Sequence, residues 1–248
     1  MTDEVRNALL VFVGGVLVLI VADGTYTHYV RPAAAPLVLA AGLVIVALAL
    51  TDVVRDLRGR PDAVPHDHHH PQERSSRVAW LLLLPVLTVL LVAPPALGSD
   101  AVDLAGGRTA PTAPTAPDAA LPPGDAPALA VVDFVSRTAA AASPSPSPGP
   151  ASALATRDVT LTGFVVPARA GSGSDLARLV ISCCAADASP VRVHLQGVPA
   201  AGTGGGDRWM RVRARWVAGT GGATDGFVPT VRVVDAVDVP AAVPAYEY

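Results

Sequence analysis

The sequence predicts a membrane α-helical N-terminal region with about three spans, followed by a small all-β C-terminal domain for which an OB-like five-stranded barrel is favoured. Composition indicates the first part, because 51% of the 248 residues are hydrophobic and only 16% are charged, against about 25% charged in ordinary soluble domains. The apolar excess lies in the first hundred residues. From residue 157 onward, runs rich in β-branched residues alternate with Gly-rich breaks, which is typical of strands and turns.

Three apolar segments are expected to cross the membrane, at about residues 7–28, 33–52 and 78–98. The uncharged core of the first, residues 8–22, is shorter than the roughly 20 residues that a spanning helix needs, so its continuation to residue 28 completes the span. A signal peptide is the alternative for this segment, but no clear small-residue cleavage motif follows it. The third segment is expected to bend at Pro85.

Arginines predict the orientation in the membrane. The loop 51–77 carries five arginines, whereas the loop between the first two spans carries Arg31 alone. Because positive charge is retained on the cytoplasmic side, the loop 51–77 and the N-terminus are expected in the cytoplasm. The chain is then a multi-pass protein in contact with lipid, and its C-terminal domain is extracytoplasmic.

Between the membrane region (1–98) and the β domain (157–248), residues 99–156 are predicted to form a linker. Its Pro/Ala/Ser repeats favour an extended, polyproline-like chain, and residues 127–142 are compatible with a short helix. Five strand-like runs follow, and the fourth, RWMRVRARWV, alternates apolar residues with arginine as a half-buried antiparallel strand does. A small closed barrel fits five such strands, and a small β-sandwich is the alternative.

Two adjacent cysteines, Cys183 and Cys184, are the only ones in the chain and lie in the stretch RLVISCCAADASP. Three interpretations remain open: small buried core residues, a strained disulfide between neighbours, or soft ligands for zinc or copper. Successive side chains of a strand point to opposite faces, so both thiols reach one ion only if the strand breaks at about Ser182. Asp187 and His194 would then complete a four-ligand set.

Two other polar groups are weaker candidates. The motif HDHHH in the expected cytoplasmic loop binds metal loosely or is a solvated spacer. Its histidines are His66, His68, His69 and His70. Asp23 and His28 lie at the expected membrane boundary, where an interfacial cap is preferred over an ion-binding role.

Neither catalysis nor nucleic-acid binding is expected. The sequence contains no serine-hydrolase, zinc-protease or phosphate-loop motif, so an enzyme is not predicted. The β domain has nine arginines and eight acidic residues between 157 and 248, so it is nearly neutral, and its expected position outside the cell also argues against a nucleic-acid partner.

Five stretches of the chain together resemble a known family. They are THYVRPAAAPLVLAAGLVI, WLLLLPVLTVLLVAPPALGS, VTLTGFVV, RLVISCCAADASPVRV and VPAYEY, and the most specific is the C-C-x-A-D-A pattern of residues 183–188. These stretches are similar to the YcgQ-like permease-subunit family of poorly characterised bacterial membrane proteins. The resemblance implies an extracytoplasmic β domain and a separate multi-spanning permease as partner. The Pro-rich linker departs from the compact members.

These features lead to one principal expectation about function and one alternative. The first is an accessory subunit of a two-component permease system, in which the β domain captures or gates a ligand such as a metal ion. The alternative is an envelope redox or stress sensor, or a structural membrane anchor, with no role in transport.

Overall fold

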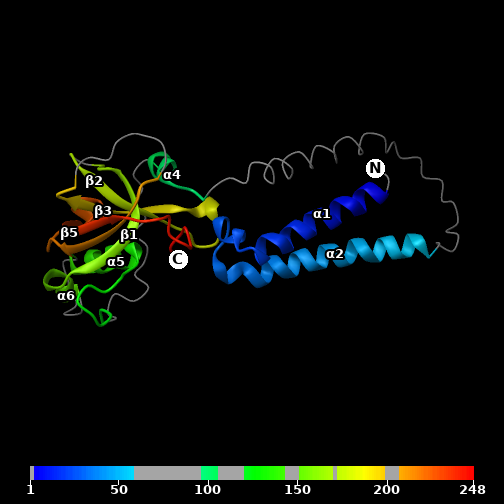
Figure 1. The fold of residues 1–248 in the computed structure, drawn as a ribbon, viewed down its shortest axis with the longest axis horizontal. Coiled ribbons are helices and arrows are strands. Elements are labelled where there is room, and N and C mark those ends of the chain that lie inside the picture. The colour runs from blue at the N-terminus through cyan, green and yellow to red at the C-terminus, as the bar shows by residue number, and fades with distance from the viewer. Residues whose placement is uncertain (1–2, 59–95, 106–119, 143–150, 170–171, 199–206) are drawn as a thin grey trace. The chain divides into compact units, whose positions relative to one another are not determined.

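The chain divides into two compact units, Met1–Pro95 and Ala96–Tyr248. The structure, a computed structural model, describes residues 3–58, 96–105, 120–142, 151–169, 172–198 and 207–248 (Figure 1). Each unit has its own packing.

The described part of the first unit contains two apolar helices, α1 (Asp3–Ala22) and α2 (Ala35–Leu57), which pack against each other as a hairpin (Figure 1). Two short 3-10 turns, η1 (Thr25–His28) and η2 (Pro32–Ala34), connect them. Leu, Ala and Val dominate both helices, and α2 has its only proline in the first turn, where a helix tolerates it.

The prediction of about three membrane spans is wrong for the described residues. One helix there, Pro32–Arg55, is long and apolar enough to cross a membrane, judged by length and composition, and Arg6–Ala22 is a shorter apolar helix. The first expected span fails because α1 ends at Ala22 and Gly24 takes a left-handed conformation with φ of 82°, which an α-helix cannot continue through. Most of the third expected span, 78–98, lies outside the described residues.

The second unit is built on a five-stranded sheet (Figure 1). Its strands are β1 (Val159–Pro167), β2 (Ser174–Val180), β3 (Ser189–Gln196), β4 (Trp209–Trp216) and β5 (Thr230–Asp238). Their order is β1-β2-β3-β5-β4, with β4 also paired to β1. Only β3 and β5 run parallel; the other paired strands are antiparallel.

The favoured OB-like barrel requires a correction, because two joins between strands are short. β3 meets β5 over three residue pairs, and β1 meets β2 over four. Most of β5 is exposed or half-buried, so little of that strand faces a packed interior. The five strands close on one another in the order β1-β2-β3-β5-β4, but through these short ladders they form a sheet that is not a clear barrel.

Strand β4 shows how the sheet obtains its buried face. Met210, Val212, Ala214 and Trp216 are buried, whereas the three arginines between them are exposed or half-buried. This is the alternation expected of a strand with one face in the core. The buried side chains join a cluster with residues of all four other strands, including Leu161, Leu176, Val193 and Val231.

In the segment that the sequence predicts as linker, the described residues form three helices: α4 (Ser99–Leu104), α5 (Val131–Ala141) and α6 (Ala151–Thr156). α5 packs on β1, β2 and β3 (Figure 1), and its Phe134 is completely buried in the core cluster. Part of this segment is therefore an integral layer of the β domain, because the apolar face of a helix gains free energy when it is removed from water.

The C-terminal segment secures the end of β2. The backbone nitrogen of Ile181 donates to the carbonyl oxygen of Glu247 at 3.1 Å, and the nitrogen of Glu247 donates to the carbonyl oxygen of Leu179 at 2.9 Å. The residue before Glu247, Tyr246, is almost completely buried, and its hydroxyl accepts a hydrogen bond from the backbone nitrogen of Leu97. These hydrogen bonds therefore fix the position of the backbone at the end of β2, where the chain continues toward the cysteines.

Candidate metal centre

The two cysteines lie in a loop between strands, residues 182–187, which we call the dithiol loop. β2 ends at Val180 and β3 begins at Ser189, and a single 3-10 turn, η4 (Ala185–Asp187), lies between them. The strand therefore breaks just before Ser182. This break is the condition under which neighbouring thiols can lie on the same side.

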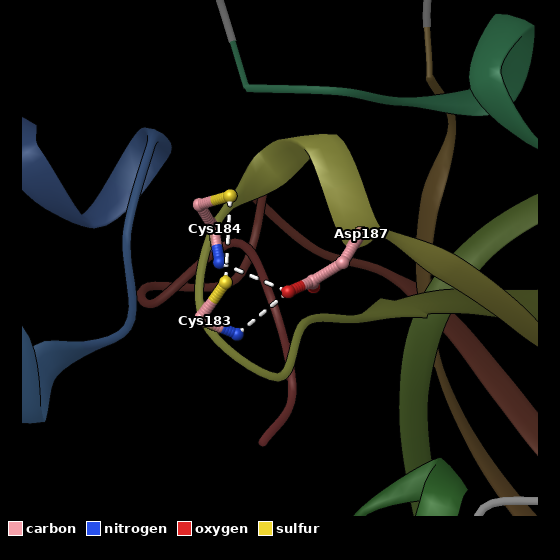
Figure 2. A group of neighbouring side chains, drawn as sticks. All are labelled: Cys183, Cys184 and Asp187. Atoms are coloured by element: carbon pink, nitrogen blue, oxygen red, sulfur yellow. Dashed lines mark hydrogen bonds between the residues drawn. The ribbon is translucent and has the colours of Figure 1, made fainter.

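The carboxylate of Asp187 organises this loop. Its Oδ1 accepts a hydrogen bond from the backbone nitrogen of Ser182 at 2.8 Å. Its Oδ2 accepts from the backbone nitrogens of Cys183 at 2.8 Å and Cys184 at 3.3 Å (Figure 2). Three consecutive N–H groups thus point at one side chain, as in the backbone concavities that bind anions. The loop is folded around its own aspartate.

Neither cysteine is a core residue. Cys183 is exposed, Cys184 is half-buried, and both thiols are free. Their sulfur atoms are 3.6 Å apart (Figure 2), well beyond the S–S bond length of about 2.05 Å. The interpretation as small buried residues therefore does not describe them, and the pair is available to solvent.

Three potential ligand atoms converge at this point. One atom from each of Cys183, Cys184 and Asp187 lies within 4.8 Å of the other two, close enough to surround an ion. Thiolate sulfur and carboxylate oxygen are both ligands of zinc, and thiolates also select copper(I). The described residues thus bring together three of the four ligands expected from the sequence.

His194, the fourth, lies elsewhere. In the β2–β3 ladder it is opposite Asp175, and its Nδ1 is 2.9 Å from the Asp175 Oδ1. The Asp175 side chain is buried and also contacts the guanidinium of Arg192 at 3.5 Å. His194 is thereby engaged in an ion-pair cluster on β2 and β3 and is not among the donors that surround the thiols.

Electrostatics in the dithiol loop favour a protonated thiol beside an ionised carboxylate. The hydrogen bond to Asp187, followed by that to Cys184, raises the pKa of Cys183 to about 11. The same thiol, followed by the backbone N–H groups, lowers the pKa of Asp187 to about 2 against some opposition from burial. A metal ion must therefore displace a proton from Cys183 to bind there.

A cavity of about 550 Å³ borders the dithiol loop. Its lining comprises Leu104 and Ala105 next to residues 186–190, so it shares Asp187 with the cluster. The loop therefore has open space beside it within the β domain.

The weaker sequence candidates are not part of this cluster. His66, His68, His69 and His70 lie outside the described residues. Asp23 accepts a hydrogen bond from the backbone nitrogen of Thr25 at 2.9 Å, at the turn that follows α1. The ring of His28 lies 6.5 Å from that of Tyr29, between ring centres.

Sequence reasoning treated Asp187 as a ligand and missed its role in holding the loop. One signal was available, since Asp187 lies three residues after Cys184, the spacing at which a side chain caps the backbone N–H of a helical turn. It also missed Glu247, whose carboxylate joins the C-terminal segment to α5.

Comparison with known proteins places a family match on the N-terminal part of the chain. Residues 5–108 match the DUF1980 N-terminal domain. The match extends from α1 through α2 to α4 and ends before α5 and the five-stranded sheet. DUF1980 is an uncharacterised family, and the match is compatible with the YcgQ-like resemblance. No curated protein and no solved structure matches the chain.

Proposed function

We propose that the protein is an accessory subunit of a two-component transport system in the bacterial plasma membrane, and that its β domain captures a thiophilic metal ion on the extracytoplasmic side. One observation carries the proposal: two free thiols and a carboxylate lie within 4.8 Å of one another on an accessible loop. Soft sulfur ligands select zinc or copper(I) over magnesium and calcium. The protein then acts by binding and not by catalysis.

The N-terminal unit supports a membrane location. Pro32–Arg55 has the length and hydropathy of a spanning helix, and large apolar side chains such as Leu37, Leu43 and Leu48 are exposed along α2. Exposed apolar side chains of this kind are stable against lipid or against another membrane helix. The resemblance to permease subunits supplies the expected partner, a separate multi-spanning permease.

Metal content of the purified protein tests the capture step. The full-length chain is purified in detergent and reductant and compared with Cys183→Ser and Cys184→Ser by elemental analysis. We expect about one zinc or copper ion per chain that both substitutions remove. A matched variant with all four histidines of the HDHHH motif changed to alanine should keep this ion. Metal that survives both cysteine changes would refute capture by the loop.

Gentle purification from the native host tests the transport role. A multi-spanning membrane protein should be recovered with the wild-type chain at constant ratio. Repeated recovery of the chain alone would contradict an accessory-subunit role, whatever the metal content.

A second candidate function is an envelope redox or stress sensor, or a membrane anchor, without a transport role. The two free thiols of Cys183 and Cys184, of which that of Cys183 is exposed, favour the redox version, because disulfide exchange requires thiols that a reactant can reach. A deletion strain with unchanged metal content and uptake but an altered envelope-stress response would support it over metal capture.

A further inference from the structure

The hydrogen bonds of Asp187 distinguish its role in holding the dithiol loop from the role of a metal ligand. A carboxylate has about four lone-pair positions, and three backbone N–H groups occupy three of those of Asp187, two of them on Oδ2, at 2.8, 2.8 and 3.3 Å. These bonds hold the backbone of residues 182–184 in the turn that brings the sulfurs together. If Oδ2 bound an ion directly, it would weaken the bonds to Cys183 and Cys184 on which the convergence depends.

The distance between the sulfurs indicates the geometry of the ion. With a zinc–sulfur bond of about 2.3 Å, a sulfur separation of 3.6 Å corresponds to an S–Zn–S angle of about 103°, close to the tetrahedral value of about 109°. A two-coordinate linear ion with the same bond length would need sulfurs about 4.6 Å apart. The existing arrangement therefore suits two adjacent positions of a tetrahedral ion.

We propose that Cys183 and Cys184 chelate a divalent, tetrahedral ion of the zinc class through their two sulfurs, that Asp187 positions the loop without binding the ion, and that the other coordination positions accept an exchangeable donor. On binding, both S–H bonds break, two sulfur–metal bonds form, and two protons leave to solvent without any transfer of electrons. This inference rests on the proposed metal capture. It makes the centre a transfer site, because an ion with open positions can be passed to a second donor.

Two features of the surroundings support an open centre. Cys183 is exposed, so solvent or a donor from another molecule can reach an ion bound to its sulfur. The cavity of about 550 Å³ lies along the same loop and has Asp187 in its wall. Structural zinc sites, by contrast, are closed by four protein ligands, whereas the donors that converge here among the described residues are two sulfurs and the carboxylate of Asp187.

Cobalt(II) provides a spectroscopic test, because it occupies zinc sites and reports on its donors. The reduced, metal-free full-length protein in detergent is titrated with cobalt(II) and followed by absorption. Wild-type protein should show, at about one equivalent, a sulfur-to-cobalt charge-transfer band together with the intense visible bands of tetrahedral cobalt. The charge-transfer band distinguishes thiolate binding from any binding by histidine.

The Asp187→Asn variant distinguishes whether Asp187 positions the loop or binds the ion. The substitution should weaken cobalt affinity by about 10- to 100-fold, as loss of a residue that orients metal ligands does, and should leave the spectrum at saturation unchanged. Asp103→Asn is the control, since Asp103 is an exposed residue of α4 in the same domain; it should change neither the affinity nor the spectrum. Circular dichroism of each variant establishes that the β domain is folded.

The open coordination positions of the ion can be tested with the wild-type protein alone. Adding imidazole to the saturated cobalt complex should shift the visible bands while the charge-transfer band remains, because imidazole replaces an exchangeable donor and both sulfurs stay bound. A spectrum that imidazole does not change would overturn the inference that the ion carries an exchangeable donor. X-ray absorption at the zinc edge of the zinc-loaded protein should show two sulfur atoms bound to the zinc. A larger number of sulfur neighbours would also contradict the inference.

The outcomes separate this inference from the proposed function. A saturated spectrum that changes in Asp187→Asn would show that Asp187 is a ligand, which overturns the inference and leaves metal capture intact. Absence of a charge-transfer band in the wild-type protein would overturn metal capture itself, and the inference with it.

Discussion

Oδ2 of Asp187 lies 2.8 Å from the backbone nitrogen of Cys183, and a carboxylate oxygen of Asp187 lies within 4.8 Å of the Cys183 sulfur. One side chain thus fixes the backbone of the exposed cysteine and favours the protonated form of its thiol. Because a carboxylate beside a thiol disfavours the thiolate, the pKa of Cys183 is raised to about 11.

The first prediction concerns alkylation of the metal-free protein. Thiolates react and thiols do not, so Cys183 should react slowly with iodoacetamide at neutral pH although it is exposed. The alkylation rate of Cys183 should rise with pH, with a midpoint at about 11. Asp187→Asn should accelerate the reaction near neutrality, and peptide mass spectrometry distinguishes the two cysteines. A wild-type midpoint near the ordinary cysteine value of about 8.5 would contradict this prediction.

The second prediction concerns stability in acid. The buried carboxylate of Asp158 accepts hydrogen bonds from the Nε atoms of Arg213 and Arg215, each at 2.9 Å. Burial opposes ionisation, but the bonds to Arg215 and Arg213 outweigh it and hold the pKa of Asp158 below its usual 3.8. The lowered pKa means that this stabilisation is complete above pH 3.8 and is lost as the pH falls through the folded value.

Asp158→Asn checks this. It should lower the free energy of unfolding by about 1–3 kcal/mol near neutrality, and the difference from wild type should shrink at pH values below 3.8. The control is Asp125→Asn, because Asp125 also pairs with Arg213 but its side chain is 89% exposed, and exposed pairs contribute about 0–1 kcal/mol. Urea unfolding at several pH values gives both numbers. A loss that does not vary with pH would be inconsistent with the ion pairs.

The third prediction concerns the helix hairpin. A Cβ built on Gly14 would lie 2.7 Å from a methyl group of Val46 and 2.8 Å from the carbonyl oxygen of Gly42, whereas one built on Gly15 meets nothing within 4 Å. Gly14→Ala should therefore push α1 from α2 and cost about 1–3 kcal/mol. Gly15→Ala, its neighbour in the same helix, should be neutral or stabilising by up to about 1 kcal/mol.

Thermal unfolding of the full-length protein in detergent, followed by the helical circular-dichroism signal, compares the two glycine variants. The melting temperature should fall for Gly14→Ala and should hold or rise for Gly15→Ala. Equal effects at both positions would mean that the close approach of the helices is not important for stability.

The fourth prediction concerns the C-terminal segment. The carboxylate of Glu247 accepts hydrogen bonds from the first two backbone nitrogens of α5, those of Val131 at 2.9 Å and Val132 at 2.7 Å. It also lies 3.4 Å from the buried guanidinium of Arg178. Glu247→Ala removes the carboxylate that faces this buried cation and the acceptor for the first two N–H groups of α5, and should cost about 3 kcal/mol.

Glu247→Gln is the matched variant, since it keeps the shape of the side chain and one acceptor oxygen. It should cost less than Glu247→Ala. Urea unfolding followed by the fluorescence of the buried Trp209 and Trp216 measures both. A small loss in the alanine variant would show that the segment does not stabilise the domain.

Local patterns predicted much of the β domain. The alternation of apolar residues and arginines in RWMRVRARWV is seen as alternating burial in β4, because side-chain direction in a strand has a period of two. The break near Ser182 could likewise be read from AADASP, whose small and polar residues end a strand. Each of these features depends on residues that are neighbours in the chain.

Other features could not be predicted because they depend on distant partners. The sequence placed His194 across from the cysteines, but the register of β2 and β3 placed it opposite Asp175, and register is set by the burial of a whole face. α5 lies in a stretch flanked by Pro-rich repeats, and one face of this helix is buried because it packs on the sheet. The end of α1 depended on one backbone angle at Gly24.

By itself, the sequence determined that an apolar helical region precedes a five-stranded β domain and that two thiols and an aspartate lie within five residues of one another. Only the tertiary structure decided that these groups converge and that His194 does not join them. The physical reason is that hydrophobic periodicity encodes which face of an element is buried. It does not encode which backbone N–H groups a side chain accepts or which residues meet across a sheet.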